Sequence, residues 1–274
     1  MFDAVLLFRE ALYGTIVIAL ACSVLGVYVV LRRIVFVGAA LAQLSSAGIA
    51  LALFLSGQGM LLWLGDRPIL AALIVTLAGA LFFGSGSGRG KVPPDATIGV
   101  TYAVAAAAGI LLIAKASHGE AHDIFLQGNI LGITRADTLV LVATAIPVLL
   151  AHAIFYKEFL FVSFDRETAR TLGFNVGFWN LFLYLTLGLV IAFAMQFAGV
   201  MLVFNFLVLP AVTGLLISRS MAGTFFWSIV SALIAAAVGF SLSVPFDLPS
   251  GPAIIAVSGI LVSCAFLVRL SQRR

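Results

Sequence analysis

Charge, histidine and cysteine are all scarce in this sequence. Asp, Glu, Lys and Arg account for 9% of its 274 residues, and it has three histidines and two cysteines. Soluble domains carry about 25% charged residues, so the composition excludes an ordinary soluble enzyme. Cys22 and Cys264 lie inside apolar runs, where free cysteine commonly behaves as a small buried hydrophobe. They indicate neither a disulfide framework nor a metal–thiolate site.

Catalytic and nucleotide-binding motifs are absent as well. The segment GSGSGRGKVPPD (84–95) approaches a phosphate-binding loop, but Ser85 and Val92 stand where that motif needs a glycine and a hydroxyl residue. The sequence contains no HExxH motif. We therefore expect no enzyme activity and no bound cofactor in this chain, so energy for any transport must come from a partner.

Apolar residues, by contrast, make up 63% of the chain, and the mean hydropathy is +1.21. Runs long enough to cross about 30 Å of hydrocarbon occur at 13–31, 34–55, 68–84, 96–115, 138–156, 178–197, 199–218, 222–244 and 252–268. We predict an all-α polytopic membrane protein, with residues 1–274 forming a single bundle of nine transmembrane helices. QFAG (196–199) predicts a tight antiparallel turn, and residues 1–12 predict a short interfacial helix.

The basic residues predict an orientation, because short cytoplasmic loops accumulate lysine and arginine. A cytoplasmic C-terminus places most of the 15 basic residues inside and most of the 11 acidic residues outside. We therefore predict a multi-pass protein of the inner (cytoplasmic) membrane with its N-terminus outside. Because the positive charges sit at helix ends, they favour the lipid bilayer as a partner and argue against nucleic acid.

Polar side chains inside the predicted spans are candidates for a translocation path, because they cost free energy in lipid unless they face a cavity or another helix. These candidates are Gln43, Ser46, Gln196, Asn205 and the kink-forming Pro210. The alternative for each polar side chain is a hydrogen bond between helices. A self-sufficient secondary transporter or channel would need a charged residue within a span, and none lies near the middle of a predicted one.

Two of the three histidines lie in SHGEAHD (117–123), which the predicted topology places outside. His118, Glu120, His122 and Asp123 carry the imidazole and carboxylate groups that bind divalent metals. The segment is thus a candidate metal-binding loop. The alternative is a solvated polar loop without a metal.

The densest charge cluster is SFDRETARTLGF (163–174) in the longest predicted cytoplasmic loop. Asp165 suits a helix N-cap, Arg170 suits the negative end of the helix dipole, and Gly173 suits the left-handed position that ends a helix. Ala169 and Leu172 then share a face, three residues apart. We predict a short amphipathic helix that either lies solvated at the headgroup level or docks a protein.

This cluster resembles the F-D-x-E-x-A-x-x-L-G segment by which the membrane subunits of bacterial zinc, manganese and iron ABC importers engage their ATPase. Residues 25–55, 126–141 and 197–219 are similar to further segments of that family. The resemblance implies a permease for a divalent metal ion, present in two copies, with cytoplasmic ABC ATPase subunits that use ATP and an extracytoplasmic metal-binding protein. The residues it implies in ATPase coupling are Asp165, Arg166, Glu167, Ala169, Arg170, Leu172 and Gly173.

One departure from the family pattern bears on the substrate. Family members commonly carry D-A-x-S-H in the second helix, where this chain reads GAALAQLSS. Ala39 stands in place of the aspartate and Gln43 in place of the histidine. The chain thus lacks two donors that suit Mn²⁺ or Zn²⁺, which leaves a metal chelate as an alternative substrate.

Overall fold

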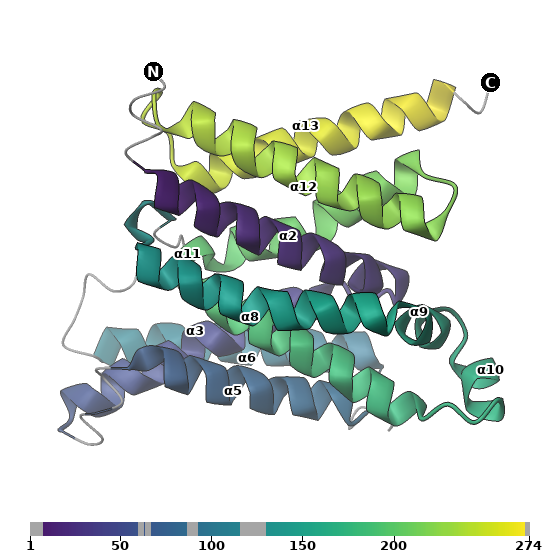
Figure 1. Ribbon diagram of the computed structural model, residues 1–274. Coiled ribbons are helices and arrows are strands. Elements are labelled where there is room, and N and C mark those ends of the chain that lie inside the picture. The colour runs from purple at the N-terminus through teal and green to yellow at the C-terminus, as the bar shows by residue number, and fades with distance from the viewer. Residues whose placement is uncertain (1–7, 60–62, 64–66, 87–92, 116–129, 272–274) are drawn as a thin grey trace.

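The computed structural model describes residues 8–59, 63, 67–86, 93–115 and 130–271, and all the regular structure in these ranges is helical (Figure 1). The longer helices are α2 (Arg9–Leu31), α3 (Phe36–Gly57), α5 (Pro68–Gly84), α6 (Pro94–Lys115), α8 (Arg135–Ile154), α11 (Val176–Ile217), α12 (Met221–Ser243) and α13 (Ser250–Ser271). Shorter elements are the 3-10 turn η1 (Ile130–Gly132), α9 (Tyr156–Phe164) and α10 (Arg166–Thr171).

Seven of the described helices are long and apolar enough to cross a membrane, and α5 is a shorter apolar helix of 17 residues. An all-helical polytopic membrane protein is therefore confirmed. Helices satisfy their own backbone groups, which is what a chain crossing hydrocarbon requires. Residues 9–12, which the sequence assigns to a separate interfacial helix, form the first turn of α2, and residues 1–7 lie outside the described part of the chain.

Helix α11 is 42 residues long and is interrupted at Gly199, whose backbone is non-helical with φ 69° and ψ 169°. Positive φ is accessible to glycine because it has no Cβ. The break lies within the QFAG stretch, where the sequence predicts a tight turn.

Contacts along α2 show that the two arms of α11 run in opposite directions. Asn180 accepts a hydrogen bond from Arg32, directly after the C-terminal end of α2. Ala194 lies against the first half of α2, where both border one small cavity. Leu207, in the second arm of α11, lies against Gly26, near the C-terminal end of α2. Figure 1 shows this reversal on the side of the bundle where α2 begins.

Small residues allow the central helices to approach closely. The ideal Cβ position at Gly26 overlaps the backbone of Leu207, and that at Gly214 overlaps the backbone of Thr224. Close backbone approach at small residues is a typical packing mode of membrane helices. Helices α2 and α3 are mostly buried, whereas α6 and α13 expose most of their surface, as lipid-facing helices do.

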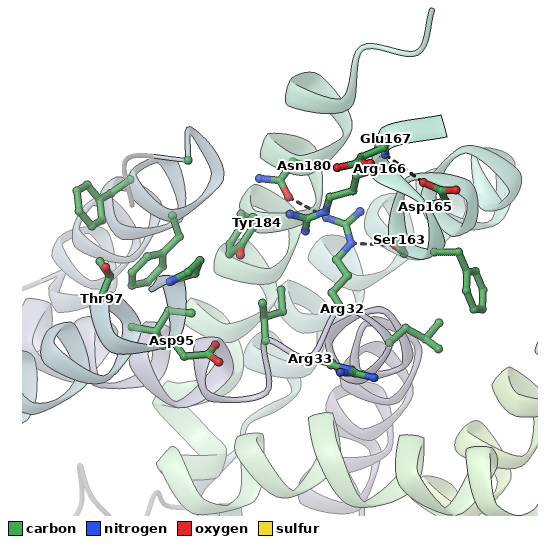
Figure 2. Close-up of a pocket in the computed structure, with 18 residues that line it drawn as sticks. Arg32, Arg33, Asp95, Thr97, Ser163, Asp165, Arg166, Glu167, Asn180 and Tyr184 are labelled. Atoms are coloured by element: carbon green, nitrogen blue, oxygen red, sulfur yellow. Dashed lines mark hydrogen bonds between the residues drawn. The ribbon is translucent and has the colours of Figure 1, made fainter. Parts of the chain in front are cut away.

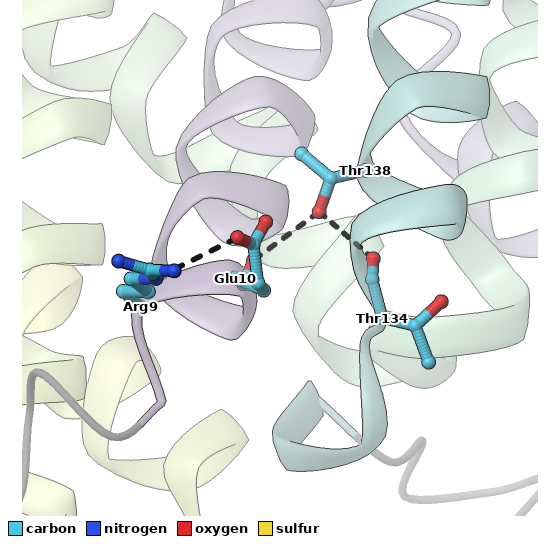
Figure 3. A network of polar contacts seen from close by, with 4 residues as sticks. All are labelled: Arg9, Glu10, Thr134 and Thr138. Atoms are coloured by element: carbon cyan, nitrogen blue, oxygen red, sulfur yellow. Dashed lines mark hydrogen bonds and ion pairs between the residues drawn. The ribbon is translucent and has the colours of Figure 1, made fainter.

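Polar contacts join the N-terminal ends of α2 and α8 (Figure 3). The Thr138 hydroxyl lies 3.3 Å from the backbone oxygen of Glu10 and 3.2 Å from that of Thr134. Arg9 forms a surface ion pair with Glu10 at 3.8 Å. Thr134 also caps α8 through a capping box with Asp137.

Replacing Gly26 with alanine should destabilise the protein by about 1–3 kcal/mol, because the new methyl group must displace the backbone of the second arm of α11. Unfolding of the detergent-solubilised protein measures this loss. Gly99→Ala is the matched control, since nothing lies within 4 Å of its Cβ position. Equal stability of the two variants would contradict the close α2–α11 contact.

Candidate functional site

Helix α9 is anchored at one end of the bundle by aromatic packing. Phe159 is fully buried and stacks on His152 with ring centroids 4.3 Å apart. It also packs against Tyr28 of α2 at 5.6 Å and Trp179 of α11 at 5.3 Å. The segment that follows α9 is therefore held firmly against the membrane helices.

Helix α10 has the N-cap and the terminating glycine that the sequence predicts. One oxygen of Asp165 accepts hydrogen bonds from the backbone amides of Glu167 and Thr168 at 3.1 and 2.9 Å, and the other accepts from the Thr168 hydroxyl at 2.6 Å. These bonds, above all those from Thr168, lower the pKa of Asp165 because they stabilise its charged form. Gly173 follows the helix with φ 86°.

The apolar residues of this segment point in different directions. Ala169 is 0% exposed and packs against Val162 and Val176 of its own chain. The prediction that Ala169 and Leu172 share one face is therefore wrong, because α10 needs a small residue where it meets the ends of α9 and α11. Leu172 is 65% exposed, and Arg170 is exposed on the same short segment.

A guanidinium group connects this segment to the rest of the bundle (Figure 2). Nε of Arg32 donates to the Ser163 hydroxyl at 2.8 Å, and Nη1 donates to the Asn180 side-chain oxygen at 2.9 Å. The Asn180 amide in turn donates to the backbone oxygen of Gly84 at 2.8 Å. These bonds join α2, α9, α11 and α5, and we call Arg32, Ser163, Asn180 and Gly84 the arginine clamp.

A cavity of about 600 Å³ lies beside the arginine clamp. Its walls come from the α2–α3 turn, the facing ends of α5 and α6, the α9–α10 junction and the start of α11. Arg32, Arg33 and Arg166 line it together with Asp95, Asp165 and Glu167. Nη2 of Arg32 is itself buried and has no hydrogen-bond partner among the described residues. Burial, and secondly the positive charge of Arg166, lower the pKa of Arg32 to about 10, so the group remains charged at neutral pH.

The sequence points to Arg32 only as a marker of topology and does not single out Ser163 or Asn180. Both bind Arg32, which lies 131 residues from Ser163 and 148 residues from Asn180 along the chain. No local pattern in the sequence therefore reveals the arginine clamp. Two features of the sequence could have pointed to the clamp. They are the pair Arg32 and Arg33 directly after an apolar run, and Asn180 within a later apolar run.

The residues predicted to line a translocation path lie on two helices, α3 and α11. Gln43 and Ser46 are buried on α3, and Asn205 and Pro210 are buried on the second arm of α11. Gln196 is exposed beside the α11 break. Asn205 donates to Ser258 of α13 at 3.0 Å, which is the hydrogen bond between helices that the sequence leaves open as an alternative.

The candidate metal loop cannot be placed. His118, Glu120, His122 and Asp123 all lie outside the described residues. Within the described ranges, no three or more His, Cys, Asp or Glu side chains form a group that could hold a metal ion.

The sequence and the fold both match known proteins. A family described as the ABC 3 transport family matches residues 5–269. The manganese transport system membrane protein MntC of Listeria innocua is 32% identical over 96% of this chain and 91% of its own. The manganese import system permease protein ScaB of Streptococcus gordonii is 30% identical over 97% of this chain and 92% of its own.

A solved structure titled PsaBC from Streptococcus pneumoniae in complex with Fab matches with a TM-score of 0.81. It is 27% identical in sequence, and the match covers 94% of this chain and 90% of that one.

Removing the cap with Asp165→Ala should fray α10, because the backbone amides of Glu167 and Thr168 lose their acceptor. Faster hydrogen exchange of these amides at neutral pH measures the effect. Asp165→Asn is the control, since its amide oxygen still accepts. In the unaltered protein, the stabilisation of α10 by the Asp165 carboxylate is complete above the ordinary aspartate pKa. It is lost as the pH falls through the lowered pKa of Asp165. Unchanged exchange in the alanine variant would contradict the capping role.

Proposed function

Since this chain belongs to the ABC 3 transport family, we propose that it is the membrane-spanning permease subunit of an ABC importer for a metal. The whole-length match to that family carries the proposal, and the multi-pass helical fold supports it. The chain provides the translocation path in the cell membrane. ATP hydrolysis belongs to a partner subunit.

The proposed topology has nine passes. Counting the two arms of α11 separately and including α5 gives the nine spans that the hydropathy predicts. The arginine clamp, α9 and α10 share one end of the bundle with Arg219, which follows α11. The concentration of arginine there supports a cytoplasmic location for that end and a cytoplasmic C-terminus.

We propose that α10 is the coupling helix. It protrudes at the proposed cytoplasmic end, and Leu172 exposes a large apolar side chain beside Arg170. Ala169 is buried within the chain, and Leu172 is the most exposed large apolar side chain of segment 163–174. We therefore take Leu172 as the apolar anchor for an ATPase groove, with Arg166, Glu167 and Arg170 at its rim. The arginine clamp would then carry a displacement of α10 into α2, α5 and α11 as a rigid-body movement.

The complete importer would contain two copies of this permease, cytoplasmic ABC ATPase subunits and an extracytoplasmic metal-binding protein. Manganese is the first candidate substrate, because the relatives MntC and ScaB are named for manganese. A metal chelate is the second, because Ala39 and Gln43 are buried in α3 without the carboxylate and imidazole that a bare ion favours. The loop at 118–123 would receive the metal outside.

Leu172→Asp should weaken association with the ATPase at least about 30-fold and abolish metal uptake, because a charge replaces the apolar anchor of the docking surface. Co-purification of the tagged permease with its ATPase, together with uptake of radioactive manganese, measures both effects. Leu172→Met keeps an apolar side chain and is the control. Normal uptake by Leu172→Asp would disprove the coupling role.

The paired change Ala39→Asp and Gln43→His tests the route of the metal. If bare Mn²⁺ passes these positions, the two added ligands should tighten its apparent affinity for uptake about tenfold. Competition between manganese, zinc, iron and iron chelates measures the change, with Gln43→Asn as the control. An unchanged manganese affinity would indicate that the ion does not contact this part of α3.

A further inference from the structure

The described part of the chain leaves one face of α3 partly uncovered. Ala39, Gln43 and Ser46 keep 8, 7 and 6% of their surface accessible, whereas the intervening Ala40, Leu41 and Ala42 are 0% exposed. Spacings of three and four residues place side chains on one face of a helix. We call this face the α3 stripe, and it consists of Phe36, Ala39, Gln43, Ser46 and Ala47.

The polar side chains of the α3 stripe make no hydrogen bond with any described residue. This holds for the Gln43 amide and for the Ser46 hydroxyl. On the neighbouring helices α5 and α11, by contrast, the hydroxyls of Thr76 and Thr213 donate to backbone oxygens one turn earlier. A polar group within a span costs free energy unless it meets a partner or a hydrated cavity. Gln43 and Ser46 therefore indicate that the α3 stripe faces a polar path and not lipid.

A phenylalanine lies at the end of the α3 stripe that is nearest to the arginine clamp. Phe36 is the first residue of α3 and is 65% exposed. Its ring stacks on that of Phe204, in the second arm of α11, with centroids 6.5 Å apart. Gln43 lies seven residues further along α3, which is about 10 Å along the helix axis. A polar group that leaves Gln43 toward this end of the bundle must therefore pass the two phenyl rings.

We propose that Phe36 and Phe204 form the inner gate of the translocation path, an apolar constriction that separates Gln43 and Ser46 from the cytoplasm. Apolar constrictions stop ions and polar solutes because water leaves them. The inference rests on the importer proposed above, in which a second copy of the chain closes the open side of the α3 stripe. The exposed ring of Phe36 then faces the same ring of the second copy across the path.

A gate fits these observations better than an aromatic anchor in the lipid headgroup layer. Lipid-facing helices such as α13 expose many large apolar side chains, whereas Phe36 is the single exposed one of α3. The remainder of the α3 stripe is nearly buried and polar in its middle, which lipid does not explain.

The position of Phe36 in the chain also connects the gate to the proposed coupling helix. Residues 33–35 are all that separates Phe36 from Arg32, and Arg32 is bonded to Ser163, directly before α10. A displacement of α10 by the ATPase would therefore reach the gate through the turn between α2 and α3.

The test is the rate at which Ser46→Cys reacts with a positively charged, membrane-impermeant methanethiosulfonate reagent. The full-length permease carries Cys264→Ser, which removes the exposed native cysteine, while Cys22 is buried. Inside-out membrane vesicles without ATP present the proposed cytoplasmic end to the reagent. Ser46→Cys should react at least about tenfold faster after Phe36→Ala, because the constriction loses a ring. The exposure of Phe36 means that its replacement leaves the packed core unchanged.

The chain offers three matched controls. Phe226→Ala removes a phenylalanine of α12 that is 59% exposed, and it should leave the rate at Ser46→Cys unchanged. Ser45→Cys lies one residue outside the α3 stripe at a position that is 0% exposed, and it should stay unreactive with or without Phe36→Ala. Phe36→Trp keeps a large apolar ring and should keep the protection.

Three outcomes would overturn the proposal. Equal rates at Ser46→Cys with and without Phe36→Ala, whether fast or slow, would mean that Phe36 does not control access to the α3 stripe. Acceleration by Phe226→Ala as well would mean that the bundle loosens in general. Equal reactivity of Ser45→Cys and Ser46→Cys would mean that the stripe is not the open face of α3.

The same measurement separates the gate from the importer function on which it rests. A reversed orientation would move the effect of Phe36→Ala from inside-out to right-side-out vesicles. The labelling reaction uses neither metal nor ATPase, so a failure of the importer proposal would appear in the uptake experiments and would leave the labelling rates unchanged.

Discussion

The burial of one positive charge organises the end of the bundle that carries α9 and α10. Removing the Arg32 guanidinium from water is costly unless its N–H groups find acceptors, and Ser163 and Asn180 provide two of them. Asn180 extends the network to Gly84. Segments that are far apart in the sequence thus meet in one hydrogen-bonded junction. This junction positions α10, the short helix that follows α9.

The opposite end of the bundle is joined differently. There a hydroxyl–backbone contact between Thr138 and Glu10 links α2 to α8, and Gly199 lets α11 turn back. Neither the Thr138–Glu10 contact nor the turn at Gly199 buries a charge. The end with the arginine clamp is therefore the one where electrostatic changes in a partner or a membrane would act most directly on the helices.

Much of this architecture follows from local sequence. Long apolar runs predict the helices, Asp165 and Gly173 predict the limits of α10, and the glycine in QFAG predicts the reversal in α11. The orientation of Ala169 does not follow, because it depends on Val162 and Val176, which meet α10 only in the folded chain. The pairing of Arg32 with Ser163 and Asn180 could not be predicted either, because it joins three separate segments and its driving force is burial, which exists only in the packed state.

The contact at Gly26 has a mechanical consequence. At this point the backbones of α2 and the second arm of α11 meet without an intervening side chain on the α2 side. Interlocking side chains resist sliding, because neighbouring ridges must climb over one another. The α2 side chains one turn to either side of Gly26, Cys22 and Val29, are buried, so a shift of one helix along the other would press the Leu207 backbone against them. The notch at Gly26 therefore fixes the register between α2 and the second arm of α11, and these two segments should move as one unit.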